Sequence, residues 1–486
     1  LAYDIELVVR PRKGNNVPFY ECYRQICNEI GNELFQNCSV GGWKTSYISS
    51  AIKELIEDIS TALSPSLYDM YSEQLPFGFK ISRTYIFQDD KITCDKHDDF
   101  IKYIVNSCFT DLMKKYPVSL YIVGQTIFLW HHRHLELISR LKSDEVIFGK
   151  NIEKAAEIQI SLTSSGDAHN FGRKSYVIKL KNKNNKIEHL CYKPRNLSID
   201  NLFFKEIFNL ISKLVEIDIR VPQVINKGDY GYTEFISKTK NTNSVSCSQF
   251  LNGIWLYVLW ILGITDCTRE NFCFNGEQYI LVDFETALQG YFRNLTTSTK
   301  NQLTTRALYA LSCMRTYYVP VWDIEDDSFE NTCLGNLPNE EFSNDSLWIN
   351  ANTDFIVYKS DYITQKVVAN LSSRPILDHT FISELIRGFT YASDKLQNKI
   401  ELLYSRINKE QNLYSRFLFR NTITYFQFSN ELKSPNSLHS LTSFMSKLDR
   451  INLNEVSMNH SFFNWICEQE KMQLLGLDIP YFKFNI

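Results

Sequence analysis

Four short motifs, which follow one another along the chain, carry most of the residues that could do chemistry. They are GDAHNFGR at 166–173, YKPR at 192–195, DCTREN at 266–271 and VDFE at 282–285. A phosphoryl-transfer site uses a lysine to neutralise nucleotide phosphates, an Asp to orient or deprotonate a hydroxyl, and Asn and Asp side chains to hold magnesium. The motifs supply these residue types in the same order, as Lys193, Asp266, Asn271 and Asp283. Their order and spacing predict a kinase-like core.

The lysine is predicted to lie at the end of a strand in a small sheet. Residues 175–181 and 187–193 alternate between apolar and polar types, and the polar stretch between them is typical of a turn. Lys193 ends the second of these strands. Pro194 stops further pairing there because it has no N–H group to donate.

A helix at 203–215 and a further strand at 232–236 are predicted to follow. Strand, strand, helix and strand is the layout of the small lobe of a kinase. Glu206 on the predicted helix could form an ion pair with Lys193. The alternative interpretation is an exposed helix residue.

The two acidic motifs are predicted to follow a helix and a strand. The apolar helix at 250–264 leads into the loop 266–271, and the short strand at 279–282 presents Asp283 and Glu285. The segment 323–354 comes later in the chain and is polar and acidic with little periodicity, so a long loop or insertion is expected there. Helical spacing returns from 361, is clearest at 381–403, and is followed by a basic and aromatic stretch at 416–428.

The N-terminal third, from 19 to about 141, has apolar residues at three- and four-residue intervals and is predicted to be helical. It contains the densest group of histidines, His131, His132 and His134, with Arg133 among them. Two interpretations are open, a metal site and a polar helix face. The metal site lacks an acidic or thiol partner at ligand spacing.

Composition excludes several classes of protein. The chain of 486 residues has a net charge of −3, which argues against a nucleic-acid partner. Its twelve cysteines form no C-x-x-C pair, so reduced thiols and no zinc site are expected. The longest apolar run, 251–265, is too short to cross a membrane, and the chain opens without a signal segment. A cytoplasmic protein without a transmembrane segment is therefore expected.

Together with YGYTEF at 230–235, RFLFRNT at 416–422 and LDIPYF at 477–482, the motifs resemble the dehydratase domain of class II lanthipeptide synthetases, the LanM type. The resemblance runs from about 157 to the end. The chain ends soon after LDIPYF without the zinc-binding cysteines and histidine of the C-terminal cyclase of that family. Either a separate cyclase is therefore a partner, or the chain is a fragment of a longer synthetase.

The resemblance implies an α+β fold with a kinase-like, lipid-kinase-related, two-lobed core and additional helical regions at both ends. The expected regions are a helical N-terminal part at 1–150, a small lobe at 151–240 and a large lobe at 241–486. The large lobe would include the acidic insertion and a C-terminal helical region for elimination.

The reaction that the resemblance implies has two steps on a ribosomally made precursor peptide. Ser or Thr is phosphorylated with ATP and Mg²⁺, and phosphate is then eliminated to leave dehydroalanine or dehydrobutyrine. The implied residues for phosphate transfer and its cofactor are Lys193, Asp266, Asn271, Asp283 and Glu285, of which the last three would bind Mg²⁺. The implied residues for elimination are Asp167, His169, Arg416 and Thr422. One departure is Thr268, which stands where histidine is usual in the family and cannot buffer a proton near neutral pH.

Two alternatives to the dehydratase remain open from the sequence. The first is a Ser/Thr peptide kinase that leaves the phosphate in place. The second is an inactive scaffold that binds the leader part of the precursor, which only Thr268 supports.

Overall fold

The computed structural model describes most of the chain, with gaps. The described residues are 16–36, 44–75, 93–152, 154–163, 167–237, 245–268, 270–275, 278–289, 312–319, 322–323, 328–329, 333–334, 348–358, 379–417, 419–420, 422–452 and 460–485.

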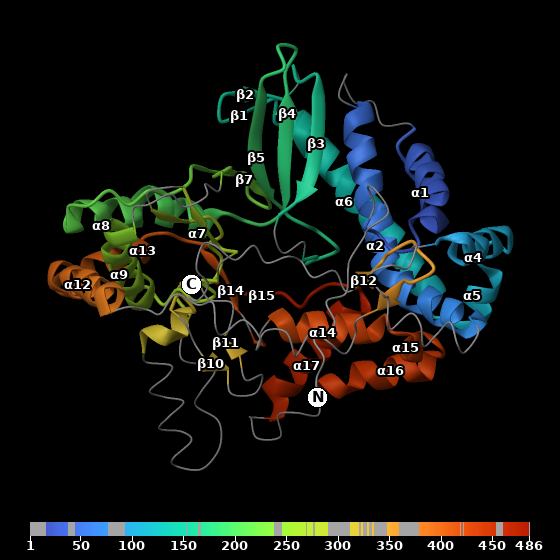
Figure 1. Cartoon of the computed structure of the whole chain (residues 1–486). Coiled ribbons are helices and arrows are strands. Elements are labelled where there is room, and N and C mark those ends of the chain that lie inside the picture. Colours follow the sequence, from blue (N-terminus) through green and yellow to red (C-terminus); the bar gives the residue numbers. More distant parts are fainter. Residues whose placement is uncertain are drawn as a thin grey trace.

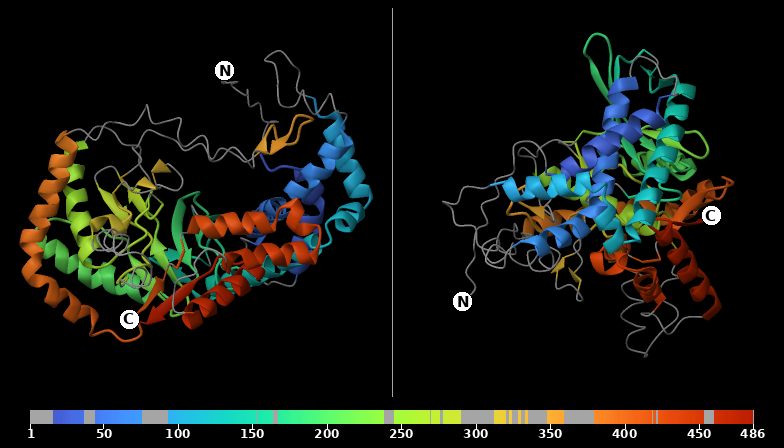
Figure 2. Two further views of the ribbon diagram at one scale, coloured as in Figure 1. Left: turned by 90° about the horizontal axis from the view of Figure 1, so that it is seen from below. Right: turned by 90° about the vertical axis from the view of Figure 1, so that its right-hand side faces the viewer.

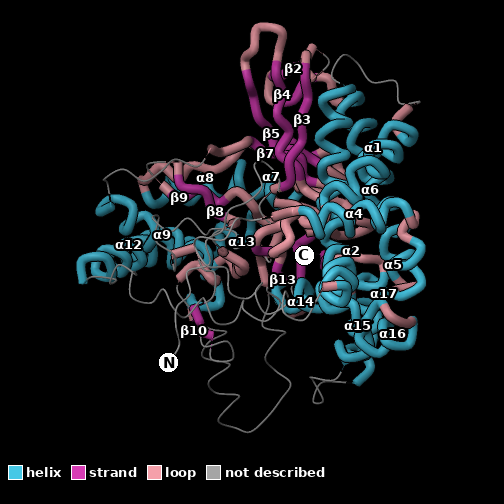
Figure 3. Tube along the Cα trace, turned by 45° about the vertical axis from the view of Figure 1, so that its right-hand side comes forward, coloured by secondary structure: helices cyan, strands magenta, loops and turns pink. Residues whose placement is uncertain are grey.

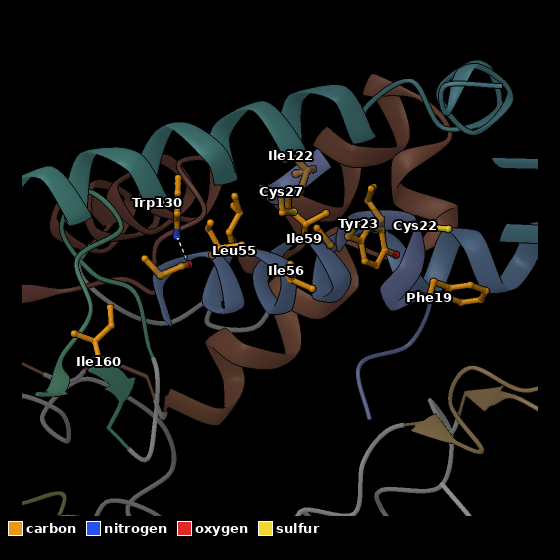
Figure 4. Close-up of a cluster of buried hydrophobic side chains, with 14 of the residues drawn as sticks. Phe19, Cys22, Tyr23, Cys27, Leu55, Ile56, Ile59, Ile122, Trp130 and Ile160 are labelled. Atoms are coloured by element: carbon orange, nitrogen blue, oxygen red, sulfur yellow. Dashed lines mark hydrogen bonds between the residues drawn. The ribbon is translucent and has the colours of Figure 1, made fainter. Parts of the chain in front are cut away.

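The N-terminal region is helical, as its periodicity predicts (Figure 1). Its helices are α1 (Tyr20–Leu34), α2 (Lys44–Gln74), α4 (Asp95–Asn106), α5 (Thr110–Lys115) and α6 (Ser119–Ser143). The apolar residues Leu55 and Ile59 of α2 are buried against α1 and α6 (Figure 4). Trp130 of α6 is also buried there, and its indole N–H donates to the Ala51 carbonyl at 2.8 Å.

The histidine group on α6 forms a polar helix face only in part, because His132 is exposed and His131 is half-buried. Arg133 and His134 are buried, and Arg133 donates to Glu54 of α2. The His134 Nδ1 lies 2.9 Å from the Tyr47 hydroxyl, and its Nε2 lies 3.3 Å from Glu54. The polar-face interpretation is wrong for Arg133 and His134, which are buried next to a carboxylate of the neighbouring helix that periodicity cannot reveal.

A five-stranded antiparallel sheet follows the N-terminal helices (Figure 3). Its strands lie in the order β3 (Glu157–Leu162), β4 (Tyr176–Lys181), β5 (Ile187–Lys193), β7 (Gly231–Glu234) and β6 (Val224–Asn226), and a small hairpin of β1 (Val146–Ile147) and β2 (Lys150–Asn151) precedes them. Tyr176, Ile178 and Leu180 alternate with half-buried residues along β4, and they share a hydrophobic core with the N-terminal helices. The predicted strands at 175–181 and 187–193 are confirmed, and Lys193 ends β5.

A second hydrophobic core forms around the helices after the sheet strand β5. These are α7 (Ser198–Leu202), the π-helical turn η1 (Phe203–Ile207), α8 (Phe208–Val215), α9 (Val245–Ile261), α12 (His379–Leu396) and α13 (Ile400–Ile407), with the 3₁₀ turns η3 (Cys313–Thr316) and η5 (Gln397–Lys399). The predicted helices at 203–215 and 250–264 are confirmed, with boundaries shifted by a few residues. The hairpin of β8 (Phe272–Phe274) and β9 (Tyr279–Leu281) connects the two acidic motifs.

The predicted loop or insertion at 323–354 contains short strands as well as turns where the structure describes it. Two short antiparallel hairpins occur there, β10 (Trp322–Asp323) with β11 (Ser328–Phe329), and β12 (Trp348–Ile349) with β13 (Val357–Tyr358). Between the last two strands, Asp354 is buried and accepts the backbone N–H of His97 at 2.8 Å. This segment thus packs on the N-terminal helices, and its acidic residue is an interior helix cap rather than a solvated charge.

The C-terminal region consists of β14 (Tyr414–Phe417), α14 (Thr422–Leu432), α15 (Pro435–Leu438), α16 (Leu441–Asp449), the 3₁₀ turn η6 (Arg450–Asn452), α17 (His460–Leu475) and β15 (Phe482–Asn485). Figure 2 shows these helices, in red, alongside the N-terminal helices, in blue. The Val118 N–H donates to the Leu438 carbonyl at 3.2 Å across this boundary. β15 returns to pair antiparallel with β14, so that Arg416 lies opposite Lys483.

None of the helices in the described ranges is both long enough and apolar enough to cross a membrane. The kinase-like two-lobed arrangement stays a prediction. The described architecture is mixed helix and antiparallel sheet with two hydrophobic cores.

Candidate active site

The lysine and the second acidic motif meet at the end of the sheet. Lys193 is 5% exposed, and its ammonium lies 2.6 Å from Oδ2 of Asp283. Asp283 lies two residues after β9, which holds it at the end of the β8–β9 hairpin. The structure therefore brings together two residues that are far apart in the sequence and that were predicted to share a site.

Arg195 is a central residue of this cluster that sequence reasoning did not single out. Its Nη1 donates to Asp200 at 2.7 Å, and its Nη2 donates to Asp283 at 3.0 Å. Its Nε lies 3.2 Å from a carboxylate oxygen of Glu285. The available signal was its place in the YKPR motif, five residues before Asp200, which lies on α7.

Glu285 joins Arg195 to Arg416, which comes from β14. The Arg416 Nη1 donates to Glu285 at 2.6 Å, and the Arg416 backbone N–H donates to the Glu285 carbonyl at 2.7 Å. The other two donor atoms of Arg416, Nε and Nη2, are buried and have no hydrogen-bond partner among the described residues. Buried donors without partners are costly, so this pair fits an anionic ligand that binds in a forked geometry.

The GDAHNFGR turn is held by the C-terminal segment. His169 Nδ1 lies 2.8 Å from the Ile479 carbonyl, and the Ile479 N–H donates to the Ala168 carbonyl at 2.8 Å. The carboxylate of Asp478 accepts the N–H groups of Phe171 and Gly172, both at 2.7 Å. The LDIPYF motif therefore fixes the turn that carries His169. Gly166 lies outside the described residues.

Tyr481, in the same C-terminal motif, is a second residue that the sequence did not indicate. The centroid of its ring lies 5.2 Å from Cζ of Arg416 and 5.5 Å from the centroid of the His169 ring. One aromatic side chain thus contacts two residues that the resemblance assigned to elimination.

The DCTREN loop joins the same cluster. The Asn271 amide donates to the Asp266 carbonyl at 2.7 Å, and the Val282 N–H donates to the Asn271 carbonyl at 2.9 Å. Asp266 has φ of 59°, in the left-handed region, which is uncommon outside glycine. Backbone strain of this kind is typical of functional sites.

Residues 116–485 match the model of a family described as a domain of unknown function, DUF4135. The chain belongs to the DUF4135 family. It is also similar to the Lacticin 481/lactococcin biosynthesis protein LcnDR2 of Lactococcus lactis subsp. lactis, with 24% identity over 413 residues. That match covers 78% of this chain and 42% of the relative, so the chain spans less than half of that protein. The two matches confirm the resemblance to class II lanthipeptide synthetases.

Two carboxyl groups of the DUF4135 site have raised pKa values. Burial raises the pKa of Asp266 to about 7; Arg416 opposes this shift, and Glu285 and Asp283 add to it. Burial likewise raises the pKa of Asp167 to about 6 against the effect of Arg416. Carboxyl groups that titrate near neutral pH are suited to general acid–base catalysis.

Three further groups of the site, His169, Asp283 and Glu285, have lowered pKa values. Burial and the positive charge of Arg416 lower the pKa of His169 to about 4, so its imidazole is neutral at pH 7. Burial opposes ionisation of Asp283, but Lys193 and Arg195 more than offset it and hold the pKa of that carboxyl below its usual range. Arg416 and Arg195 do the same for the pKa of Glu285. The site therefore contains two constant anions and two groups that titrate near neutrality.

The predicted magnesium ligands lie close together in the DUF4135 site, and their side chains carry the oxygen atoms that such a site needs. Carboxylate and amide oxygens are the ligands that Mg²⁺ prefers, and Asp283, Glu285 and Asn271 bring them close to Lys193. Both oxygens of Asp283 already bind cationic side chains. No group of three or more His, Cys, Asp or Glu side chains in the described ranges is arranged to hold a metal. Magnesium binding stays a prediction, and it requires Asp283 to exchange a side-chain partner for the metal.

Two residues named from the sequence, Glu206 and Thr422, are not placed in the DUF4135 site by the structure. Glu206 is exposed and borders an open surface pocket with Lys205 and Arg406, whereas Lys193 binds Asp283. The alternative interpretation of Glu206 as an exposed helix residue is therefore confirmed, and the Glu206–Lys193 ion pair is wrong. Thr422 begins α14, and its side chain lies outside the described part of the structure.

Proposed function

We propose that this DUF4135 domain is an ATP-dependent dehydratase of a ribosomally made lanthipeptide precursor. It would phosphorylate Ser and Thr and then eliminate the phosphate to give dehydroalanine and dehydrobutyrine. One observation carries the proposal: the phosphoryl-transfer residues Lys193 and Asp283 share a cluster with Arg416, whose two unpartnered buried donors fit a phosphate.

The residues around Lys193 support the phosphoryl-transfer step. Bound Mg·ATP would supply the γ-phosphoryl group and the charge neutralisation that its transfer needs. Lys193 is placed to neutralise phosphate oxygens, and Asn271, Asp283 and Glu285 would hold the metal. Asp266, with a pKa near 7, can accept the proton of the attacking hydroxyl in its ionised form.

The residues around Arg416 support elimination. In this step the α C–H bond breaks, its electron pair forms the carbon–carbon double bond, and the Cβ–O bond breaks with phosphate as the leaving group. Arg416 Nε and Nη2 can bind the departing phosphate. His169 donates from Nδ1 to the Ile479 carbonyl, which leaves Nε2 of the neutral ring as the atom that can accept the α-proton.

The partner of the proposed dehydratase is a precursor peptide with leader and core parts. Ring closure between its dehydrated residues and cysteines requires a cyclase. We propose that a separate protein or a further domain supplies this activity, because the motifs of this chain account only for dehydration.

Mass spectrometry of a precursor peptide tests the proposal. Incubation with ATP and Mg²⁺ should give peptide that has lost the mass of one water per modified residue. A stable gain of one phosphate per residue would identify the peptide kinase instead, and unchanged peptide without ADP release would favour the scaffold.

Lys193→Met should abolish both ADP release and the change in peptide mass, because the phosphates lose their cationic partner. Asp283→Asn should have the same effect, since it weakens the metal site. Lys186→Met is the matched control, because Lys186 lies just before β5 and its ammonium binds only the nearby Glu188 on the surface. Near wild-type dehydration by Lys193→Met would contradict the assignment of the site.

A further inference from the structure

One short C-terminal segment, 478–482, contacts both the turn that carries His169 and the strand β14 that carries Arg416. Asp478 and Ile479 bind the backbone of the GDAHNFGR turn, and Phe482 begins the strand that pairs with β14. Tyr481 lies between these two anchors. Its backbone N–H donates to the Gln473 side chain of α17 at 2.8 Å. The position of the Tyr481 ring is therefore fixed by backbone contacts on both sides.

The Tyr481 ring contacts two functional side chains that come from different motifs. Its centroid lies 5.2 Å from Cζ of Arg416 and 5.5 Å from the His169 centroid. Arg416 has one side-chain ion pair, to Glu285 through Nη1. The aromatic contact is thus a second restraint on the guanidinium, and it leaves Nε and Nη2 for a ligand.

We propose that Tyr481 is a positioning residue for elimination: its ring holds the Arg416 guanidinium and the His169 imidazole in the arrangement that the step requires. The inference rests on the proposed function. Arg416 must present two donors in one plane to the departing phosphate, and a ring packed against the guanidinium limits its rotation and excludes water. His169 must face the same reacting residue, and the same ring packs beside it.

The contacts are made by the ring, so the hydroxyl is dispensable. Tyr481→Leu removes the aromatic contact with both residues, whereas Tyr481→Phe keeps it. The matched control is Tyr414→Leu, which removes an aromatic ring from β14, the strand that carries Arg416. The Tyr414 ring lies under Lys483 rather than Arg416.

The first measurement is the partition of a precursor peptide between phosphorylated and dehydrated products. Misplaced catalytic groups cost about tenfold to a hundredfold in rate. Tyr481→Leu should therefore slow elimination by that factor while ATP consumption continues, so that phosphorylated peptide accumulates. Arg416→Met should accumulate the same species. Tyr481→Phe and Tyr414→Leu should give the wild-type partition, which a general loss of stability would not explain.

The second measurement does not depend on turnover. Calorimetric titration with inorganic phosphate, and separately with a phosphoserine peptide, reports the anion site directly. Tyr481→Leu should bind both about tenfold more weakly than wild type and Tyr481→Phe, in line with loss of a preorganised donor pair. ATP affinity should be unchanged.

The outcomes separate the inference from the proposed function. If wild type neither phosphorylates nor dehydrates peptides, the proposed function fails, and the phosphate titrations alone decide the role of Tyr481. Equal phosphate affinity and equal product partition in wild type and Tyr481→Leu would overturn the inference. Identical defects in Tyr481→Leu and Tyr481→Phe would also overturn it, because they would assign the effect to the hydroxyl.

Discussion

At the scale of single residues, the site is organised by arginines that neutralise its carboxylates. Arg195 contacts three acidic side chains from two parts of the chain, Asp200 of α7 and the pair Asp283 and Glu285 of the VDFE motif. A lysine has one ammonium group and could not reproduce the forked contacts of Arg195. This arrangement favours the ionised forms of Asp283 and Glu285 and holds both side chains in place.

Asp266 is expected to destabilise the folded protein above neutral pH. Its pKa of about 7 lies above the usual value of an Asp carboxyl, so it adds stability at low pH and loses that contribution as the pH rises through 7. Asp266→Asn, which stays neutral, should be more stable than wild type by about 1–2 kcal/mol at pH 8, after a discount for partial exposure. The difference should shrink toward pH 4, as measured by chemical unfolding across pH.

Asp99→Asn is the control for this measurement, because Asp99 is an exposed residue of α4 that pairs with Lys102 on the surface. It should give no comparable pH-dependent gain. A stability difference for Asp266→Asn that is constant from pH 4 to 8 would contradict the raised pKa.

Sequence reasoning found the residues of the site that belong to recognisable motifs. Lys193, Asp266, Asp283 and Arg416 were predicted, and the structure brings them together. Arg195 was missed because an arginine two residues after a lysine has no distinctive spacing. Tyr481 was missed because its role depends on a strand pairing between segments far apart in the sequence.

At the scale of secondary structure, the contact between α9 and α12 depends on glycine. A Cβ atom on Gly388 would collide with the Phe250 carbonyl oxygen of α9, and one on Gly253 would collide with the Leu385 carbonyl oxygen of α12. The two helix backbones are therefore close enough that a single methyl group would separate them. The motif loop 266–271 follows α9 directly, so this contact also affects the site.

Gly388→Ala should destabilise the protein by about 1–3 kcal/mol, because the added methyl group overpacks the helix contact. Thermal or denaturant unfolding measures the change. Gly124→Ala is the matched control, since Gly124 lies within α6 and a Cβ atom there would meet no atom within 4 Å. That variant should be stabilised by about 0.5–1 kcal/mol through helix propensity. Equal effects of the two substitutions would contradict the close approach of α9 and α12.

Periodicity predicted most helices and strands because the apolar pattern is local. It identified β4, β5, α9 and α12 within a few residues. It failed for the hairpins at 322–358, where each strand has only two residues and no pattern can be recognised. It also could not predict that β15 pairs with β14.

At the scale of the whole molecule, the two hydrophobic cores are connected by chain segments that return to the N-terminal helices. Asp354 accepts the His97 backbone N–H at the start of α4 and the Thr93 hydroxyl, and the Asn352 side chain donates to the Val17 carbonyl. These contacts tie the segment 348–358, which lies in the sequence between α9 and α12 of the second core, to helices of the first core.

Asp354→Ala should therefore destabilise the protein by about 1–2 kcal/mol, since α4 loses its cap and the N–H of His97 loses a buried partner. Amide hydrogen exchange should show faster exchange at the start of α4 and in 348–358. Asp98→Ala is the control, because Asp98 is a half-buried acidic residue in the first turn of the same helix. An unfolding free energy equal to that of wild type would contradict the bridging role of Asp354.

Because β15 pairs with β14, the parts of the site can form only in a certain order while the chain is synthesised on the ribosome. Lys193 and Asp283 can meet once the polypeptide has been synthesised past the β8–β9 hairpin, because both lie in the first part of the chain. Arg416 gains its partner strand, and His169 its aromatic neighbour, only after Tyr481 and β15 have emerged. Since folding during translation proceeds from the N-terminus, a nascent chain assembles the lysine–aspartate pair before it can restrain the arginine. The group that would release phosphate is thus the last to be put in place.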